Sequence, residues 1–192
     1  MNVLRPLPWL ATALLASCAA PQIEVKRAEA VKPDQHPSRP LFDWHGDDVP
    51  GPVSINISLS EQKAHIFRDG REVAWTYVAT GRSGFASPRG NFSVLEKIVD
   101  KHSNKYGVVV DASGDIVNGN ATAGVSRIPP GGRFMGAPMP YWMRITSWGV
   151  GMHAGPIPDP GFPASHGCIR FPEEMARKLF GLVKVGTPVH IQ

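Results

Sequence analysis

Two histidines and a cysteine stand close together in the stretch MHAGPIPDPGFPASHGCIR, which runs from Met152 to Arg170. Its glycines and prolines exclude a regular helix or strand, and a long loop of this kind inside a compact domain usually carries function. Cys168 is one of only two cysteines in the chain. A cysteine nucleophile needs a nearby base or cation that lowers its pKa, and backbone N–H groups that hold an oxyanion. The stretch therefore predicts attack of Cys168 on a carbonyl carbon.

His153 and His166 compete for the role of the base. His166 is only two residues from Cys168, and side chains so placed in an extended turn need not converge, so we expect His153 to be the base. His166 would then line the pocket or fix the loop. Gly167 allows a backbone conformation that turns successive N–H groups toward one point. A zinc site that also includes Asp159 is the alternative, but the spacing lacks the paired ligands of short zinc motifs, so we expect no metal.

Short strands joined by turns are expected to position this loop. Apolar and polar residues alternate strictly from Val53 to Leu59, which predicts a half-buried strand. Asp69 and Gly70 predict a hairpin, and Pro172 suits the first position of the one convincing helix. Further strands are expected in the sequences AHIF, VAWTYVATG, NFSVLEKI, YGVVVD, YWMRITSWGVGMH and TPVHIQ. We therefore predict a mainly β domain, a sandwich or a partly closed barrel, with one or two short helices.

The N-terminal residues are typical of an export signal. Arg5 precedes the apolar run WLATALLAS, which is too short to span a bilayer and matches a signal-peptide core. The run leads into the sequence LASC, which ends at Cys18 and resembles the lipobox of bacterial lipoproteins. Residues 1–17 are accordingly predicted to be a lipoprotein signal peptide that leaves Cys18 lipidated. The alternative is an ordinary signal peptide that is cut at Ala19 or Ala20.

Residues 18–52 are rich in proline and mixed charges, which predicts a flexible tether between the lipid and a domain over residues 53–192. The alternative is that Phe42 and Trp44 dock on the domain and shorten the tether. Because Ala19 is not an aspartate of the kind that retains lipoproteins at the inner membrane, we expect an outer-membrane anchor and a domain on the periplasmic side.

Charge and motifs exclude several classes of partner. The formal net charge is only +4, and the basic residues are scattered rather than gathered into a patch, which argues against nucleic acid. No segment matches a phosphate-binding loop, so no nucleotide or other cofactor is expected. The lipid anchor is the only membrane contact that the sequence predicts.

The sequences SHGCIR and MHAG together resemble the signature of the L,D-transpeptidase (YkuD-type) catalytic domain, a family of bacterial enzymes that remodel peptidoglycan. SEQKAHIFRDGREV is similar to the opening hairpin of that family. ATGRSGFASPRGNFSV is similar to a family segment that has threonine before its proline, where this chain has Ser87. With the terminal VGTPVHI, the resemblance covers about residues 53–192 and implies the fold of that catalytic domain.

The resemblance implies a peptidoglycan stem peptide as substrate. Cys168 would attack the carbonyl of the third residue of a tetrapeptide stem and expel the terminal D-alanine. His153 would take and return the proton, oriented by the backbone carbonyl of Ala154. The acceptor would be an amine of a neighbouring stem, an amine of an envelope lipoprotein, or water, and the sequence does not choose among them.

The remaining site residues follow from the same resemblance. The backbone N–H groups of His166, Gly167 and Cys168 would form the oxyanion hole. Arg170 and Ser165 would lie beside the substrate, where a guanidinium suits the carboxylates of the stem. A structural pin for the loop is the alternative role of Arg170.

Three other functions compete with a transpeptidase at this stage. The first is a carboxypeptidase or hydrolase of the same family, one that releases wall-attached lipoprotein. The second is a non-catalytic peptidoglycan-binding lipoprotein, which the intact motif argues against. The third is a redox or metal protein that uses Cys168. Residues 113–140 are expected to select the acceptor, and the Gly- and Pro-rich residues 119–140 to form a flexible cover over the cleft.

Overall fold

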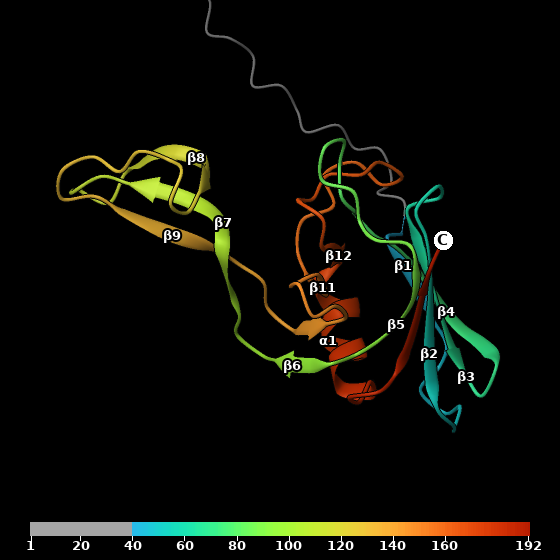
Figure 1. Ribbon diagram of the computed structural model, residues 1–192. Helices are drawn as coiled ribbons and strands as arrows, with labels where there is room; N and C mark the ends of the chain where they lie inside the picture. The colour runs from blue at the N-terminus through green and yellow to red at the C-terminus, as the bar shows by residue number, and fades with distance from the viewer. Residues whose placement is uncertain (1–39) are drawn as a thin grey trace, which may run out of the picture. The chain divides into compact units, whose positions relative to one another are not determined.

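The computed structural model describes residues 40–192, which form three β-sheets and one α-helix (Figure 1). The prediction of a mainly β fold with little helix is confirmed, and none of the three sheets closes into a barrel. The predicted signal peptide, Cys18 and most of the predicted tether lie outside the described residues. Within residues 40–192, no helix has the length and apolar character needed to cross a bilayer.

The largest sheet has six strands, and the alternating sequence at its centre explains how it packs. The strands, in order across the sheet, are β1 (Phe42–Trp44), β4 (Arg71–Tyr77), β3 (Lys63–Arg68), β2 (Val53–Ser58), β13 (Pro188–Ile191) and β5 (Gly90–Ser93). Ile55 and Ile57 of β2 are fully buried, whereas Asn56 between them is exposed. The last strand, β13, pairs with β2 in parallel, so the end of the chain closes the centre of the sheet.

The predicted hairpin joins β3 to β4. Asp69 and Gly70 have φ angles of +48° and +77°, which is the left-handed pair that a two-residue type I′ turn requires. The turn sets Arg68 opposite Arg71, and the register then shifts between Ile66 and Phe67, so that Lys63 lies opposite Tyr77 at the far end.

The folded unit begins earlier in the chain than the sequence predicts. Phe42 and Trp44 belong to β1, which pairs antiparallel with β4 on the edge of the six-stranded sheet. Both side chains pack against the buried core. The alternative in which these two aromatic residues dock on the domain is therefore the one observed. Phe42 and Trp44 dock on the domain because their side chains cover apolar surface of the core.

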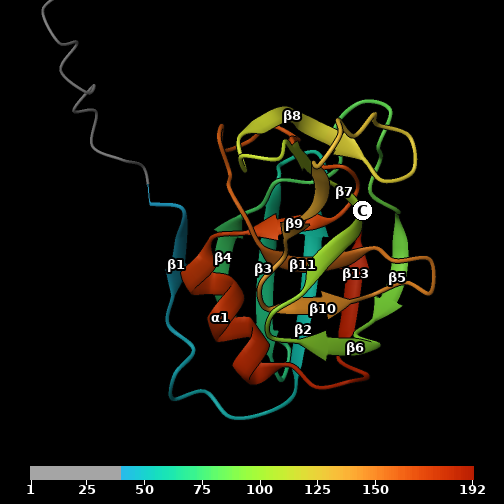
Figure 2. The same ribbon diagram turned by 90° about the vertical axis from the view of Figure 1, so that its left-hand side faces the viewer.

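A second sheet, of four strands, lies face to face with the first. Its order is β12 (Ile169–Phe171), β11 (Gly151–Ala154), β10 (Trp142–Arg144) and β6 (Glu96–Ile98). Figure 2 shows β10 and β11 in front of β2 and β3, with helix α1 (Glu173–Leu182) at the side of this layer. Buried side chains of both sheets and of α1 form one core. The predicted sandwich is thus a pair of open sheets that share this core.

Helix α1 follows β12 directly. Pro172 is the residue before the helix rather than its first residue, with a ψ of 142° that is not helical, so the helix starts one position later than predicted. Two acidic residues in the first turn complement the positive end of the helix dipole. Met175 and Leu179 are buried on one face of the helix.

The third sheet stands apart from the other two (Figure 1). It consists of β8 (Ile116–Thr122), β7 (His102–Val110) and β9 (Arg133–Pro138). The segment predicted to be a flexible cover therefore contains the end of β8 and all of β9, joined by residues 123–132. Gly136 serves close packing there, because a Cβ atom at this position would lie 1.9 Å from the carbonyl oxygen of Ser103.

Candidate active site

Strands β11 and β12 run parallel and bring His153 beside the loop end that carries Cys168. The register pairs Met152 with Ile169 and His153 with Arg170. Side chains alternate between the two faces of a sheet, and Met152 and Ile169 are fully buried in the core. His153, Arg170 and Cys168, which is two residues before Arg170, therefore share the opposite face. Neighbouring strands are about 4.8 Å apart, so the two residues predicted to be base and nucleophile face one cavity.

His153 is held as a neutral imidazole. Its side chain is buried, and Nδ1 lies 2.8 Å from the backbone oxygen of Ala154. A carbonyl oxygen only accepts hydrogen bonds, so Nδ1 carries the proton and Nε2 presents its lone pair. Burial lowers the pKa of His153 to about 4, and the hydrogen bond to Ala154 only partly offsets this effect. The imidazole is therefore a proton acceptor throughout the neutral pH range.

Cys168 is protonated in the free protein. Burial raises the pKa of its thiol, against smaller lowering effects of the Gly151 backbone and the Arg170 guanidinium. The sequence led us to expect a thiolate with a lowered pKa, whereas the structure gives a neutral thiol beside a neutral imidazole. Burial of this face of the sheet explains the difference, because removal from water disfavours both the thiolate of Cys168 and the imidazolium of His153.

The loop before Cys168 is folded around the hydroxyl of Ser165. This hydroxyl donates to the backbone oxygen of Cys168 at 2.5 Å and accepts from the N–H of Gly167 at 3.0 Å. Gly167 has a φ of +113°, as its predicted role in turning the backbone requires. The N–H of Gly167, one of the three expected oxyanion donors, is therefore already bonded within the loop. Ser165 is almost fully buried and bonds within the loop.

The segment that follows β4 clamps this loop. Ala79 and Arg170 exchange two backbone hydrogen bonds of 3.0 Å each. The hydroxyl of Ser87 accepts from the N–H of Gly81 at 2.9 Å and donates to the carbonyl of Gly167 at 2.8 Å. A Cβ atom at Gly81 would lie only 1.8 Å from the carbonyl oxygen of Phe85, so no other residue fits there. The serine found in place of the family's threonine keeps the bridging hydroxyl.

His166 has partners that the sequence did not indicate. Its Nε2 accepts from the Arg82 guanidinium at 2.9 Å, since arginine can only donate. Its ring stacks on Tyr106 with centroids 4.4 Å apart, and its edge meets Phe85 at 4.8 Å. Burial and the charges of Arg82 and Arg170 lower the pKa of His166. These contacts fix His166 in the cavity wall, which agrees with a loop-fixing role and not with that of the base.

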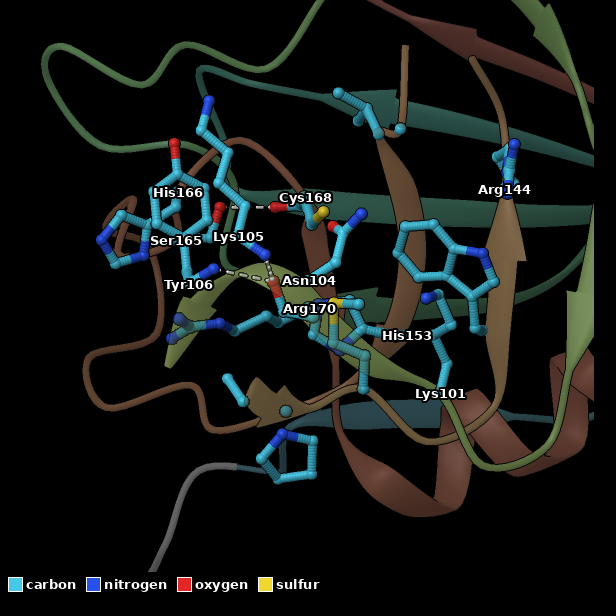
Figure 3. A pocket seen from close by; sticks show the side chains of 18 of the residues that line it. Lys101, Asn104, Lys105, Tyr106, Arg144, His153, Ser165, His166, Cys168 and Arg170 are labelled. Atoms are coloured by element: carbon cyan, nitrogen blue, oxygen red, sulfur yellow. Dashed lines mark hydrogen bonds between the residues drawn. The ribbon is translucent and has the colours of Figure 1, made fainter. Parts of the chain in front are cut away.

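A cavity of about 780 Å³ opens over this sheet face. Figure 3 shows Arg170, Tyr106 and His166 on one side of Cys168 and Arg144 on the other. Its walls come from the loop that carries Cys168, strand β10, the β10–β11 turn and the ends of β7 and β9 that are nearest the two larger sheets. No aspartate or glutamate lines it, whereas four cationic side chains do, and these are Lys101, Lys105, Arg144 and Arg170. The sequence analysis did not single out Lys101 or Lys105, because their place in the cavity wall depends on how distant segments pack.

The zinc alternative finds no support in the described part of the chain. Within residues 40–192, no three His, Cys, Asp or Glu side chains gather closely enough to hold a metal ion. Asp159, the fourth member of the suggested ligand set, does not line the cavity.

Residues 52–191 match the model of the YkuD family, the L,D-transpeptidase catalytic domain. The chain therefore belongs to the L,D-transpeptidase catalytic-domain family. It is 29% identical over 139 residues to a probable L,D-transpeptidase 3 of Mycobacterium tuberculosis, an alignment that covers 71% of this chain and 44% of that protein.

Solved structures of the same kind resemble the fold. An L,D-transpeptidase from Mycobacterium smegmatis superposes with a TM-score of 0.55 at 25% identity, over 73% of this chain and 58% of that one. A cysteine-to-serine mutant of an Enterococcus faecium L,D-transpeptidase gives a TM-score of 0.53 at 26% identity, over 73% and 50%. The chain thus spans less than two thirds of the length of each of these relatives.

Proposed function

We propose that this protein is a peptidoglycan L,D-transpeptidase in which Cys168 is the nucleophile and His153 the general base. One observation carries the proposal: the two side chains share a face of neighbouring parallel strands, and the hydrogen bond from Nδ1 of His153 to Ala154 leaves Nε2 as the proton acceptor. The family to which the chain belongs supports the reaction class.

In the acylation step, Nε2 of His153 takes the proton of the Cys168 thiol as sulfur attacks the carbonyl carbon of the third stem residue. A carbon–sulfur bond forms, and the carbonyl oxygen becomes an oxyanion that the backbone N–H groups of His166 and Cys168 stabilise. Because thiol and imidazole are both neutral at rest, charge develops only once substrate is bound.

The intermediate then collapses to a thioester. The bond between the third residue and D-alanine breaks, and the imidazolium of His153 protonates the leaving amine. An acceptor amine attacks the thioester and loses its proton to His153, which returns it to the sulfur as a new peptide bond forms. Water in place of the amine gives hydrolysis instead.

Arg170 is suited to orient the substrate. Its guanidinium lies beside Cys168 in a cavity wall that contains no acidic side chain, so a carboxylate of the stem is its natural partner. The backbone of Arg170 also pairs with that of Ala79, which gives this residue the structural role as well. Ser165 acts through the loop that it shapes, as a positioning residue beside the substrate.

Product analysis tests the proposal. The chain is incubated with disaccharide-tetrapeptide, beside its Cys168→Ala variant, and the products are separated and weighed by mass spectrometry. Loss of D-alanine with appearance of a dimer is the expected result, and loss without a dimer identifies a carboxypeptidase. Binding to peptidoglycan sacculi without any product would instead support the non-catalytic alternative.

We further propose that Cys18 is lipidated after export and tethers the domain to a membrane on the periplasmic side. The lipobox-like sequence that ends at Cys18 supports this proposal. Metabolic labelling with a fatty-acid analogue tests it, since Cys18→Ala is expected to abolish labelling and to release the protein from the membrane fraction. Labelling that persists in Cys18→Ala contradicts it.

A further inference from the structure

The two sides of the cavity differ in chemistry. On one side of Cys168, Arg170 and Lys105 present cationic groups next to His166. On the other side lies the β10–β11 hairpin, where Arg144 and Trp148 line the cavity. We call this second side the hairpin arm, and its lining residues are Trp142, Arg144, Ser147 and Trp148.

The hairpin arm offers N–H donors that have little net charge. Arg144 forms an ion pair with Glu96 at 2.8 Å, so its positive charge is already compensated. Nε of Arg144 and Nε1 of Trp142 are nevertheless buried without any hydrogen-bond partner. Trp142 is only 2% exposed, and a buried N–H that lacks an acceptor is costly. Neither N–H is open to solvent in this structure, so a neutral oxygen acceptor of a ligand reaches them only when the arm shifts.

An exposed indole completes the arm. Trp148 is 69% exposed although it lies in a short, well-bonded hairpin. The hydroxyl of Thr146 accepts from the N–H of Val150 at 2.8 Å, and Ile145 donates to the carbonyl of Val150 at 2.9 Å. A large aromatic side chain held in water at the edge of a cavity is typical of a ligand contact.

We propose that the hairpin arm binds a sugar ring of the glycan strand, with the apolar face of the pyranose on Trp148. This inference rests on the proposed function, because it assigns the glycan part of the same substrate to one side of the cavity. A pyranose has an apolar C–H face together with hydroxyl and N-acetyl oxygens, and these match an indole beside unpartnered N–H groups. The anionic stem then takes the side of Arg170 and Lys105.

Binding to a catalytically inert chain tests the proposal. In the full chain with Cys168→Ala, calorimetry measures the Kd of disaccharide-tetrapeptide and of the same tetrapeptide without sugar. The sugar is expected to lower the Kd about fivefold to tenfold, the scale of one aromatic stacking contact. Adding Trp148→Ala is expected to abolish that gain and to leave the Kd of the sugar-free peptide unchanged, and Trp148→Phe is expected to restore part of it.

A matched control is available in Phe162, which is 62% exposed but does not line the cavity. Phe162→Ala is expected to keep the full gain from the sugar. Equal Kd values for the two ligands in the Cys168→Ala chain that keeps Trp148 would overturn the proposal. An equal loss of affinity for both ligands on adding Trp148→Ala would also overturn it, because the arm would then bind peptide. If the proposed function itself is wrong, the wild-type chain releases no D-alanine, and this separate measurement tells the two failures apart.

Discussion

His153 makes the stability of the folded domain depend on pH. Its pKa is about 4 in the folded domain, against an ordinary value of 6.5 in the unfolded chain. Above pH 6.5 the imidazole is neutral in both states, and its contribution to stability is fully present. Between pH 6.5 and about 4 the unfolded chain binds a proton that the folded chain does not, so the free energy of unfolding falls as the pH falls.

The size of this effect follows from the shift itself. Each unit of difference in pKa corresponds to about 1.4 kcal/mol, so the domain loses about 3 kcal/mol over this pH window through His153 alone. His153→Gln removes the titration and keeps an amide N–H that can donate to Ala154. The stability of this variant is therefore expected to fall less steeply with acid than that of the wild type.

Urea unfolding at several pH values between 7 and 4 measures the effect, as the difference between the two chains at each pH. His102→Gln is the matched control for replacing a histidine by glutamine, because the His102 side chain is 58% exposed. If the difference between wild type and His153→Gln stays constant from pH 7 to pH 4, the account of His153 as a buried neutral base is refuted.

Three further outcomes test other parts of the structure. Alkylation of Cys168 by iodoacetamide, measured by peptide mass spectrometry, is expected to be slow at pH 7. Its rate should keep rising beyond pH 9.0, the ordinary cysteine pKa, because the thiol is neutral. A rate that is already maximal at pH 7 contradicts the neutral thiol. Gly81→Ala is expected to destabilise the domain by about 3 kcal/mol or more in urea unfolding, whereas Gly119→Ala, whose added Cβ meets no atom within 4 Å, is expected to stay within about 0.5 kcal/mol. Gln62→Ala is expected to lower the free energy of unfolding by about 2 kcal/mol and to lower kcat. The buried Gln62 side chain bonds both the N–H and the hydroxyl of Thr80, and the carbonyl of Thr80 accepts from Ser165 in the loop before Cys168. An unchanged free energy of unfolding argues against this role of Gln62.

Local patterns in the sequence were sufficient for much of the fold. The alternation that begins at Val53 and the turn at Asp69 and Gly70 are properties of a few neighbouring residues, and both structures form as predicted. β1 was missed because Phe42 and Trp44 lie among prolines, and only a sheet edge far along the chain gives them a partner.

The candidate site required long-range information. The sequence motif placed His153 and Cys168 together, but the parallel pairing that sets their common face depends on a hydrogen-bonded register between separate segments. The contact of Arg82 and Tyr106 with His166 likewise joins residues that are far apart in the chain. The pKa of the thiol was misjudged for the same reason, because burial is a property of the packed domain.

The sequence analysis also did not predict strands β8 and β9 of the third sheet. Its Gly- and Pro-rich sequence suggested hinges, yet Gly136 is needed where β9 passes close to the backbone of Ser103. Close approach and flexibility favour the same residue type, so composition alone does not separate them.

The most direct test of the central claim is the mass of the intact chain after rapid acid quench during turnover of disaccharide-tetrapeptide. The account predicts an adduct that equals the substrate without D-alanine, attached to Cys168 as a thioester and mapped to its peptide. The adduct should be absent from Cys168→Ala and should form far more slowly in His153→Gln. Release of D-alanine by Cys168→Ala, or an adduct on another residue, would contradict the assignment of the nucleophile.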